Sequence, residues 1–347
     1  MVELKGRRPG EFSFDEIIYK KEDFLATVTI NRPNVYNAYS TKTLVEMISA
    51  FQDASWDDSV AVVVLTGAGT KAFCTGGDVA EYETKFIDRP HDYWKWMGLF
   101  QGALDALRNI GKPTIARLNG IVVGGGNEFN LCCDLAVMAE HAYIKQVGTQ
   151  VGSVPCGGAT QWLPLTIGDR RAREMLFLCE EVSAPDALRW GLVNRVVPSI
   201  KNGTGKFIRP ADAPSIKDAL KNPDYEVDLS LLDQEVKSLA EKLIDKFPEC
   251  LRYTKQQTNF WKDFAWYNTI GHGREWLSLH FATREPLEGM GAFVEKRKVD
   301  YRKLRRIGAD GGSPDYVHGA PRKVCSSCGA KNLPTAFEFC GKCGAKI

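Results

Sequence analysis

The chain has 347 residues, of which 44% are hydrophobic, so it can bury a sizeable core as one large domain or two smaller ones. Its 45 basic residues nearly balance 43 acidic ones, and the net charge of +2 gives no basic field typical of nucleic-acid binding. The start of the chain lacks the pattern of a secretory signal, and no window reaches the roughly 18 apolar residues of a membrane helix. We therefore expect a soluble cytoplasmic protein with no membrane or nucleic-acid partner.

The first part of the chain alternates between strand and helix patterns. The expected strands, which are rich in β-branched residues, are 24–30, 60–66, 113–118 and 134–138. Helical spacing of apolar residues predicts helices at 41–54 and near 91–110, and Ser40 and Thr41 are candidates to cap the first of them. This alternation predicts an α/β fold with crossover helices.

The second part of the chain changes in composition. Residues 200–230 lose the periodicity and are crowded by glycine and proline, so we expect a long loop or insertion there. A helical pattern then resumes and dominates to about residue 306, and a glycine-rich linker follows. The predicted organisation is a domain at 1–306, a linker at 307–324 and a small module at 325–347.

Two glycine-rich turns follow predicted strands. The first, residues 67–78, contains Gly77, and the second, residues 119–128, contains Gly125. Glycine lets a backbone N–H approach a ligand closely, and an N–H at a helix start carries the positive end of the helix dipole. Two such N–H groups that converge on one carbonyl oxygen would form an oxyanion hole. A tight turn or a phosphate cradle is the alternative, although neither turn fits the dinucleotide or P-loop fingerprint.

These turns belong to a longer series of ordered motifs. In chain order the series is Asn31-Arg32-Pro33 with Asn37-Ala38, Phe73–Asp78, Gly124–Glu128, Cys133-Asp134, Pro155–Gln161, Ser183–Pro198 and Glu288–Arg297. Over roughly residues 20–306 the chain resembles the crotonase (enoyl-CoA hydratase/isomerase) superfamily. The resemblance implies an α/β crotonase spiral of ββα units with a C-terminal helical region. It also implies an enzyme without a redox cofactor that binds an acyl-CoA thioester, stabilises its enolate and forms a homotrimer or hexamer.

The resemblance further implies the residues of the active site. The backbone N–H groups of Gly77 and Gly125 would hold the thioester oxygen, and Glu128 would be a catalytic carboxylate. Asp78 follows the first turn and would either assist the reaction or have a hydrogen-bonded structural role.

Two other regions of the chain match ligand-binding parts of the family. Phe293 and Lys296 match positions that lie near the CoA nucleotide, often across a subunit boundary. Four aromatic residues match the variable wall of the acyl pocket, where they would shape a ring-sized cavity or form core. These residues are Tyr82, Tyr93, Trp94 and Trp96.

The chain departs from the hydratase pattern at one position. Hydratases of this family use two glutamates that share one water, and Gly148 occupies the position of the second. Glycine cannot transfer protons, which disfavours the two-glutamate route. Cys156 lies near the position of an acid in some isomerases of the family, but its thiol could carry a proton only with a depressed pKa. A small buried residue in a glycine turn is the simpler interpretation of Cys156.

Local similarity narrows the expected reaction. The segments Thr75–Tyr82 and Pro155–Pro164, together with the insertion at 200–230, look like the ring-opening 6-oxocyclohex-1-ene-1-carbonyl-CoA hydrolases of anaerobic aromatic degradation. The expected reaction is therefore water addition followed by C–C cleavage. The alternatives are an enoyl-CoA or cyclic dienoyl-CoA hydratase, an enoyl-CoA isomerase, and an inactive scaffold that binds a partner through its C-terminal module.

The C-terminal module carries a separate motif, C-x2-C-x11-C-x2-C. Its cysteines are Cys325, Cys328, Cys340 and Cys343, and a glycine follows each pair. Four thiolates at this spacing suit a closed, structural zinc site, with iron as the alternative metal. A module this short has almost no core, so the metal would supply most of its stability. We expect a zinc ribbon that clips subunits together or docks a partner, rather than one that binds nucleic acid.

Overall fold

The protein is described here by a computed structural model that covers residues 4–208, 220–313 and 315–347. The described residues fall into two compact units. The first unit comprises the described residues within Met1–Asp78, Trp94–Thr149 and Val154–Glu275, and the second comprises those within Val79–Tyr93, Gln150–Ser153 and Trp276–Ile347.

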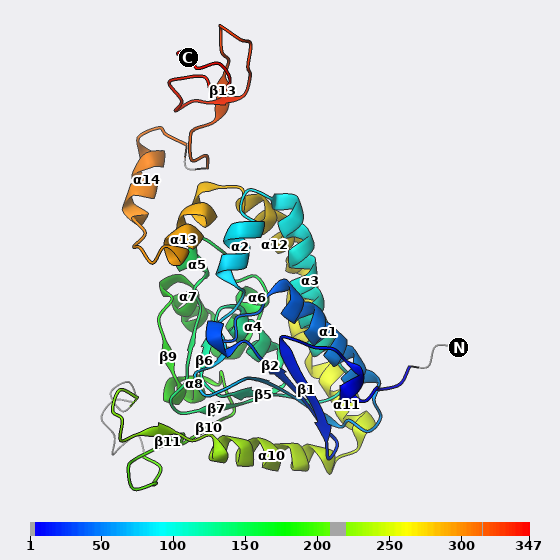
Figure 1. Ribbon diagram of the computed structural model, residues 1–347. Helices are drawn as coiled ribbons and strands as arrows, with labels where there is room; N and C mark the ends of the chain where they lie inside the picture. Colours follow the sequence, from blue (N-terminus) through cyan, green and yellow to red (C-terminus); the bar gives the residue numbers. More distant parts are fainter. Residues whose placement is uncertain (1–3, 209–219, 314) are drawn as a thin grey trace. The chain divides into compact units, whose positions relative to one another are not determined.

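A six-stranded sheet forms the centre of the first unit (Figure 1). In spatial order its strands are β1 (Ile17–Glu22), β2 (Leu25–Ile30), β3 (Val62–Gly67), β5 (Thr114–Leu118), β7 (Leu135–Ala139) and β10 (Arg195–Val197). The first two strands are antiparallel, and every other neighbouring pair is parallel. All residues of β3 are buried, which explains why its sequence is an uninterrupted apolar run.

A second sheet of four strands lies in the same unit. Its order is β4 (Ala72–Cys74), β6 (Ile121–Val123), β8 (Tyr143–Lys145) and β9 (Val182–Ser183). Strands β4, β6 and β8 each follow a strand of the first sheet in the chain and are parallel neighbours in the same order. Each repeat of the spiral therefore adds one strand to each sheet. This arrangement is the spiral of ββα units that the family resemblance implied.

Helices cover the sheets of this unit. Helix α10 (Ser230–Ile244) runs along the first sheet (Figure 1) and buries Leu232 and Val236 against Val64 and Ile115. The other helices that lie wholly or partly in this unit are α1 (Thr41–Trp56), α3 (Pro90–Arg108), α4 (Gly125–Cys132), α5 (Gly148–Val151), α6 (Ala159–Ile167), α7 (Asp169–Leu178), α8 (Ala184–Trp190), α11 (Pro248–Thr258) and α12 (Phe260–His280), with 3-10 turns η1 (Pro9–Glu11) and η2 (Pro33–Val35).

The strands and helices predicted for residues 24–138 are confirmed to within two residues at each end. Ser40 is the N-cap of α1, because its hydroxyl oxygen accepts the N–H groups of Lys42 at 3.1 Å and Thr43 at 3.2 Å. Strand β1 was not predicted. It is an edge strand with Ile18 exposed beside buried Ile17, so its apolar residues do not alternate cleanly.

The predicted insertion at 200–230 is described only in part. Its two ends form a short antiparallel pair of strands, β11 (Ile200–Lys201) and β12 (Glu226–Val227). Residues 209–219 lie outside the described residues.

Three helices and a small β-ribbon lie wholly within the described part of the second unit. These elements are α2 (Val79–Lys85), α13 (Arg284–Val294), α14 (Tyr301–Ala309), β13 (Pro321–Lys323) and β14 (Leu333–Pro334). The ring of Tyr93 stacks on Phe281 with 3.5 Å between centroids, and Tyr82 meets Phe281 edge-on at 6.1 Å. The predicted boundary between the large domain and the linker at residue 306 stays a prediction.

Candidate active site

The two glycine turns meet at the start of α4. Tyr39 binds the first turn, because its N–H donates to the Gly76 carbonyl at 2.9 Å and its carbonyl accepts the Asp78 N–H at 3.0 Å. Gly76 has φ +92°, and a β-carbon on it would lie 3.1 Å from the nitrogen of Gly125. Glycine satisfies both this left-handed conformation and this close approach. The loop that carries Gly77 therefore lies directly against the first amide of α4.

Gly125 and Gly126 let the start of α4 approach its neighbours closely. A β-carbon on Gly125 would lie 2.0 Å from the hydroxyl oxygen of Tyr39, and one on Gly126 would lie 2.1 Å from the carbonyl oxygen of Cys74. Gly125 is the first residue of α4, so its N–H belongs to the end of the helix that carries partial positive charge. The geometry suits an oxyanion hole, and the donor roles of Gly77 and Gly125 stay predictions.

Glu128 lies one turn into α4 and is only 4% exposed. Its carboxylate accepts the Ala159 N–H at 3.2 Å and also accepts the N–H of Gly157. Burial raises the pKa of Glu128 to about 7, and the two backbone N–H groups moderate the rise because they stabilise the charged form. A carboxyl group with this pKa can both accept and release a proton near neutral pH.

The turn before α6 encloses this carboxylate. A β-carbon on Gly157 would lie 2.3 Å from the Phe100 ring and 2.6 Å from Oε2 of Glu128, so only glycine fits. Cys156 is buried beside it, and burial together with the negative charge of Glu128 raises the pKa of the Cys156 thiol above its usual range. The condition for Cys156 to act as a proton carrier is therefore not met, and the structure favours the simpler interpretation.

Asp78 and Gly148 complete the set of predicted acid–base positions. Oδ2 of Asp78 lies 3.0 Å from Nη2 of Arg32, and Arg32 also donates to the carbonyl of Ala38. This ion pair supports the structural role that was one of the two expectations for Asp78. Gly148 is the buried first residue of α5 and has no side chain that could transfer a proton. Of the two predicted acid–base carboxyls, Asp78 is paired with Arg32, whereas Glu128 is buried and has a pKa near neutrality.

Tyr39 is the residue of this site that sequence reasoning missed. Its ring is 2% exposed and stacks on Phe100 at 5.3 Å and on Trp96 at 6.4 Å, measured between centroids. Trp96 is buried and packs on this tyrosine, and its role as a wall of the acyl pocket stays a prediction, whereas Tyr82 and Tyr93 pack into the core of the second unit. The position of Tyr39, just before the cap of α1, was a weak signal because nothing local connects it to Gly125.

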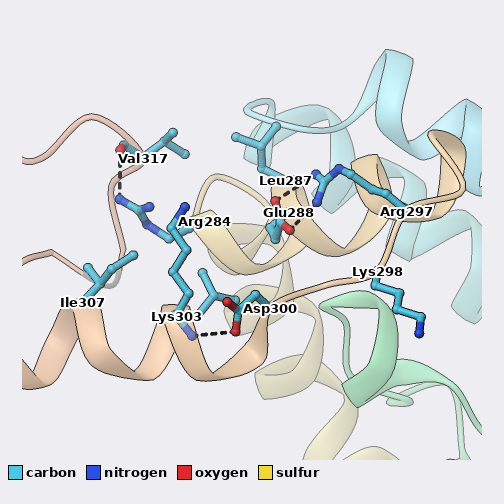
Figure 2. A pocket seen from close by; sticks show the side chains of 10 residues that line it. Arg284, Leu287, Glu288, Arg297, Lys298, Asp300, Lys303, Ile307 and Val317 are labelled. Atoms are coloured by element: carbon cyan, nitrogen blue, oxygen red, sulfur yellow. Dashed lines mark hydrogen bonds and ion pairs between the residues drawn. The ribbon is translucent and has the colours of Figure 1, made fainter.

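The predicted CoA-nucleotide residues lie in the second unit. Phe293 is near the end of α13 and 60% exposed, and Lys296 follows with φ +56°. The same unit contains a pocket of about 360 Å³ (Figure 2). Its lining residues are Arg284, Leu287, Glu288, Arg297, Lys298, Asp300, Lys303, Leu304, Ile307 and Val317. Phe293 and Lys296 do not line this pocket.

The arginines of this pocket have internal partners (Figure 2). Nη2 of Arg297 donates to Oε2 of Glu288 at 2.9 Å, and Nη2 of Arg284 donates to the Val317 carbonyl at 2.8 Å. These bonds connect α13 to the segments that follow it. The arginines therefore act first as structural connections within the second unit.

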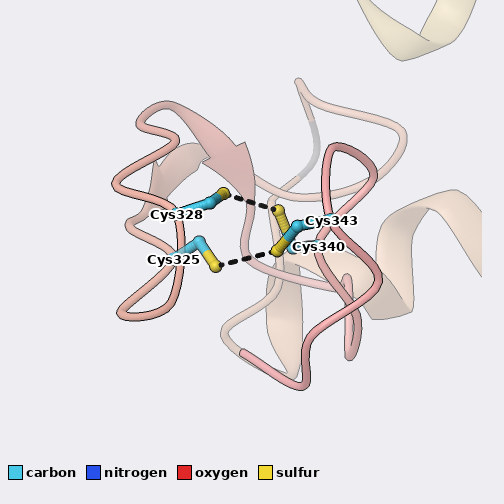
Figure 3. Close-up of side chains that lie close together, drawn as sticks. All are labelled: Cys325, Cys328, Cys340 and Cys343. Carbon is cyan, nitrogen blue, oxygen red and sulfur yellow. Dashed lines mark hydrogen bonds between the residues drawn. The ribbon is translucent and has the colours of Figure 1, made fainter.

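The four predicted metal ligands lie together (Figure 3). Their sulfur atoms are all within 4.8 Å of one another, and the Cys325–Cys343 and Cys328–Cys340 sulfur pairs are each 3.7 Å apart. Four thiolates at about 2.3 Å from a tetrahedral metal would be separated by about 3.8 Å, whereas bonded disulfide sulfurs are about 2.05 Å apart. The spacing therefore fits a tetrahedral metal site and does not fit disulfides.

Two similar turns present these sulfurs. The N–H of Gly329 donates to the Cys325 carbonyl at 2.9 Å, and the N–H of Gly344 donates to the Cys340 carbonyl at 2.8 Å. Both glycines are left-handed, with φ +70° and +73°. This repeated turn is the reason that a glycine follows each cysteine pair.

Comparisons with known proteins agree with this fold. The family model for enoyl-CoA hydratase/isomerase matches residues 20–206. The chain is 36% identical to the 6-oxocyclohex-1-ene-1-carbonyl-CoA hydrolase of Geobacter metallireducens over 83% of this chain and 82% of that protein. It is also 36% identical to the hydrolase of the same name from Thauera aromatica, over 82% of each chain. The crystal structure of an enoyl-CoA hydratase from Mycobacterium avium subsp. paratuberculosis superposes with TM-score 0.67 at 21% identity, covering 83% of this chain and 99% of that one, which bears on the fold alone.

The chain therefore belongs to the enoyl-CoA hydratase/isomerase family, within the crotonase superfamily. It is an acyl-CoA hydrolase or hydratase of that superfamily, as the sequence predicted. Among the described residues, no helix has the length and apolar character needed to cross a membrane.

Proposed function

We propose that this enzyme opens the ring of 6-oxocyclohex-1-ene-1-carbonyl-CoA by hydrolysis. The observation that carries the proposal is the buried carboxyl of Glu128, with a pKa of about 7 beside two glycine turns, while Gly148 stands where a hydratase would have its second glutamate. The 36% identity to two hydrolases that are named for this substrate supports the same reaction.

The reaction needs two additions of water. In the first, water adds across the ring double bond that is conjugated to the thioester, so its oxygen binds the β-carbon and a proton reaches the α-carbon. In the second, water adds to the ring ketone, and the bond between that carbon and the thioester α-carbon breaks. The former ketone becomes a carboxylate, the α-carbon takes up a proton, and the ring is open.

Both steps place negative charge on the thioester oxygen. In our proposal the N–H groups of Gly77 and Gly125 donate to that oxygen and lower each barrier, a contribution of about 3–4 kcal/mol per donor in comparable sites. Glu128 accepts a proton from the attacking water and returns it to carbon, which requires a carboxyl that is part protonated at the working pH. Its burial provides this property.

The test is product mass after incubation with the ring substrate, with crotonyl-CoA incubated in parallel. A product heavier by two waters from 6-oxocyclohex-1-ene-1-carbonyl-CoA, with crotonyl-CoA unchanged, is the expected result. Addition of one water to crotonyl-CoA alone would overturn the proposal in favour of an ordinary hydratase. Substitution Glu128→Gln should abolish turnover while acyl-CoA binding persists, and a parent protein without any turnover would indicate a scaffold.

We also propose that Phe293 and Lys296 bind the CoA nucleotide.

We further propose that several copies of the chain assemble into a trimer or hexamer. Exposed apolar side chains on α7 and α12, among them Phe177 and Trp261, are 62% and 65% exposed in the single chain. Such surfaces suit contacts between subunits. Native mass spectrometry should therefore detect trimers or hexamers, and a monomer at micromolar concentration would contradict this part.

The C-terminal module is proposed to hold structural zinc through Cys325, Cys328, Cys340 and Cys343. The metal would fix the two cysteine turns relative to each other and supply stability that so small a module lacks. We also propose a cytoplasmic location, where thiols such as these stay reduced. Metal analysis of the purified protein distinguishes zinc from iron.

A further inference from the structure

Tyr39 connects the two halves of the expected oxyanion hole. Its main chain binds the first turn through Gly76 and Asp78, and its side chain reaches the second turn. A β-carbon on Gly125 would lie 2.0 Å from the Tyr39 hydroxyl oxygen and 2.8 Å from the ring carbon that bears it. The hydroxyl is therefore in direct contact with the α-carbon of Gly125, next to the amide that begins α4.

The ring of Tyr39 packs against three other aromatic rings. Phe100 stacks on it with 16° between planes, Trp96 stacks with 13°, and Phe129 meets it at 89° with 5.5 Å between centroids. Because the ring packs against these neighbours and the residue is only 2% exposed, we expect the hydroxyl oxygen to keep its position without reorganisation. A fixed donor of this kind is what stabilisation of developing charge requires.

We propose that the Tyr39 hydroxyl is a third hydrogen-bond donor to the thioester oxygen, beside the amides of Gly77 and Gly125. The inference rests on the proposed function, because it concerns the same enolate. A tyrosine O–H is neutral at pH 7 and can donate one hydrogen bond, which strengthens as the oxygen becomes negative. The Phe100 ring that stacks on Tyr39 and Oε2 of Glu128 both lie against Gly157, so the aromatic stack lies close to the acid–base group.

The first test is the substitution Tyr39→Phe, which removes the hydroxyl and keeps the stacked ring. We expect kcat to fall by about 10- to 100-fold while KM and the melting temperature stay close to those of the parent. Tyr19→Phe is the matched control, because Tyr19 is a buried tyrosine of β1 whose hydroxyl donates to Asp53 at 2.8 Å. The control should lower the melting temperature and leave kcat unchanged.

A second measurement separates a donor from a merely structural tyrosine. Crotonyl-CoA bound to the Glu128→Gln protein should show a red-shifted ultraviolet absorbance, because donors at the thioester oxygen polarise its conjugated system. Adding Tyr39→Phe should reduce that shift without preventing binding. An unchanged shift, or a kcat of Tyr39→Phe within about twofold of the parent, would overturn the inference. Crotonyl-CoA serves as a general probe, so failure of the parent to open the ring substrate would refute the proposed function and leave this test intact.

Discussion

Glu128 should cost the folded protein stability at alkaline pH, and Glu128→Gln should recover it. Burial raises the pKa of this carboxyl from 4.5 to about 7. Since one pKa unit corresponds to about 1.4 kcal/mol, the cost reaches about 3 kcal/mol once the group is ionised. Glutamine has nearly the same shape, keeps an oxygen that can accept the Ala159 N–H, and cannot ionise.

The sign of the pH dependence follows from proton binding. Between pH 4.5 and about 7 the folded state binds the Glu128 proton more tightly than the unfolded chain does. The unfolding free energy contributed by this group therefore falls as pH rises through that range and is lowest above pH 7. The advantage of Glu128→Gln should be close to zero near pH 4.5 and about 3 kcal/mol near pH 8.5.

Urea denaturation of the parent and the variant at about pH 5 and pH 8.5 measures this difference. The comparison between variant and parent cancels the titration of other groups. Glu174→Gln makes the same substitution at an exposed position of α7, away from the site, and serves as the control. A Glu128→Gln advantage that differs by less than about 1 kcal/mol between the two pH values would refute the argument that burial controls this carboxyl.

Three further outcomes are expected. The kcat/KM for the ring substrate should rise with pH through an ionisation near 7, because ionised Glu128 activates water, and a flat profile would contradict that role. Gly157→Ala should lower kcat at least about 10-fold, because the added β-carbon would overlap Phe100 and Glu128. Gly271→Ala is the control, because an added β-carbon at this position of α12 would meet open space. It should leave kcat unchanged and raise the free energy of unfolding by up to about 1 kcal/mol. Cys340→Ser should reduce bound zinc from one ion per chain without changing kcat, and a large fall in kcat would assign the module a part in catalysis.

The sequence alone determined the fold and the family. Strands such as β3 are recognisable because a strand covered on both faces needs an unbroken apolar run, and the glycine turns are recognisable because close backbone approach excludes a β-carbon. The four cysteines predicted a metal site, and the structure brings their sulfur atoms together as expected, because ligand spacing within a short module is a local property. Edge strand β1 was not predicted because apolar residues occupy both its buried and its exposed positions, so the sequence does not alternate between apolar and polar residues.

Only the tertiary structure decided how the site is completed. The pKa of Glu128 depends on burial and on two N–H groups from a turn about 30 residues later, and no local pattern encodes that environment. The same packing makes Cys156 an unsuitable proton carrier and pairs Asp78 with Arg32. Tyr39 is 86 residues from Gly125 in the chain, and their contact exists because the spiral brings the start of α1 beside the start of α4. The motifs identify candidate catalytic residues. The distances between them in the folded chain, and the burial of each side chain, decide which candidates have the geometry and pKa for catalysis.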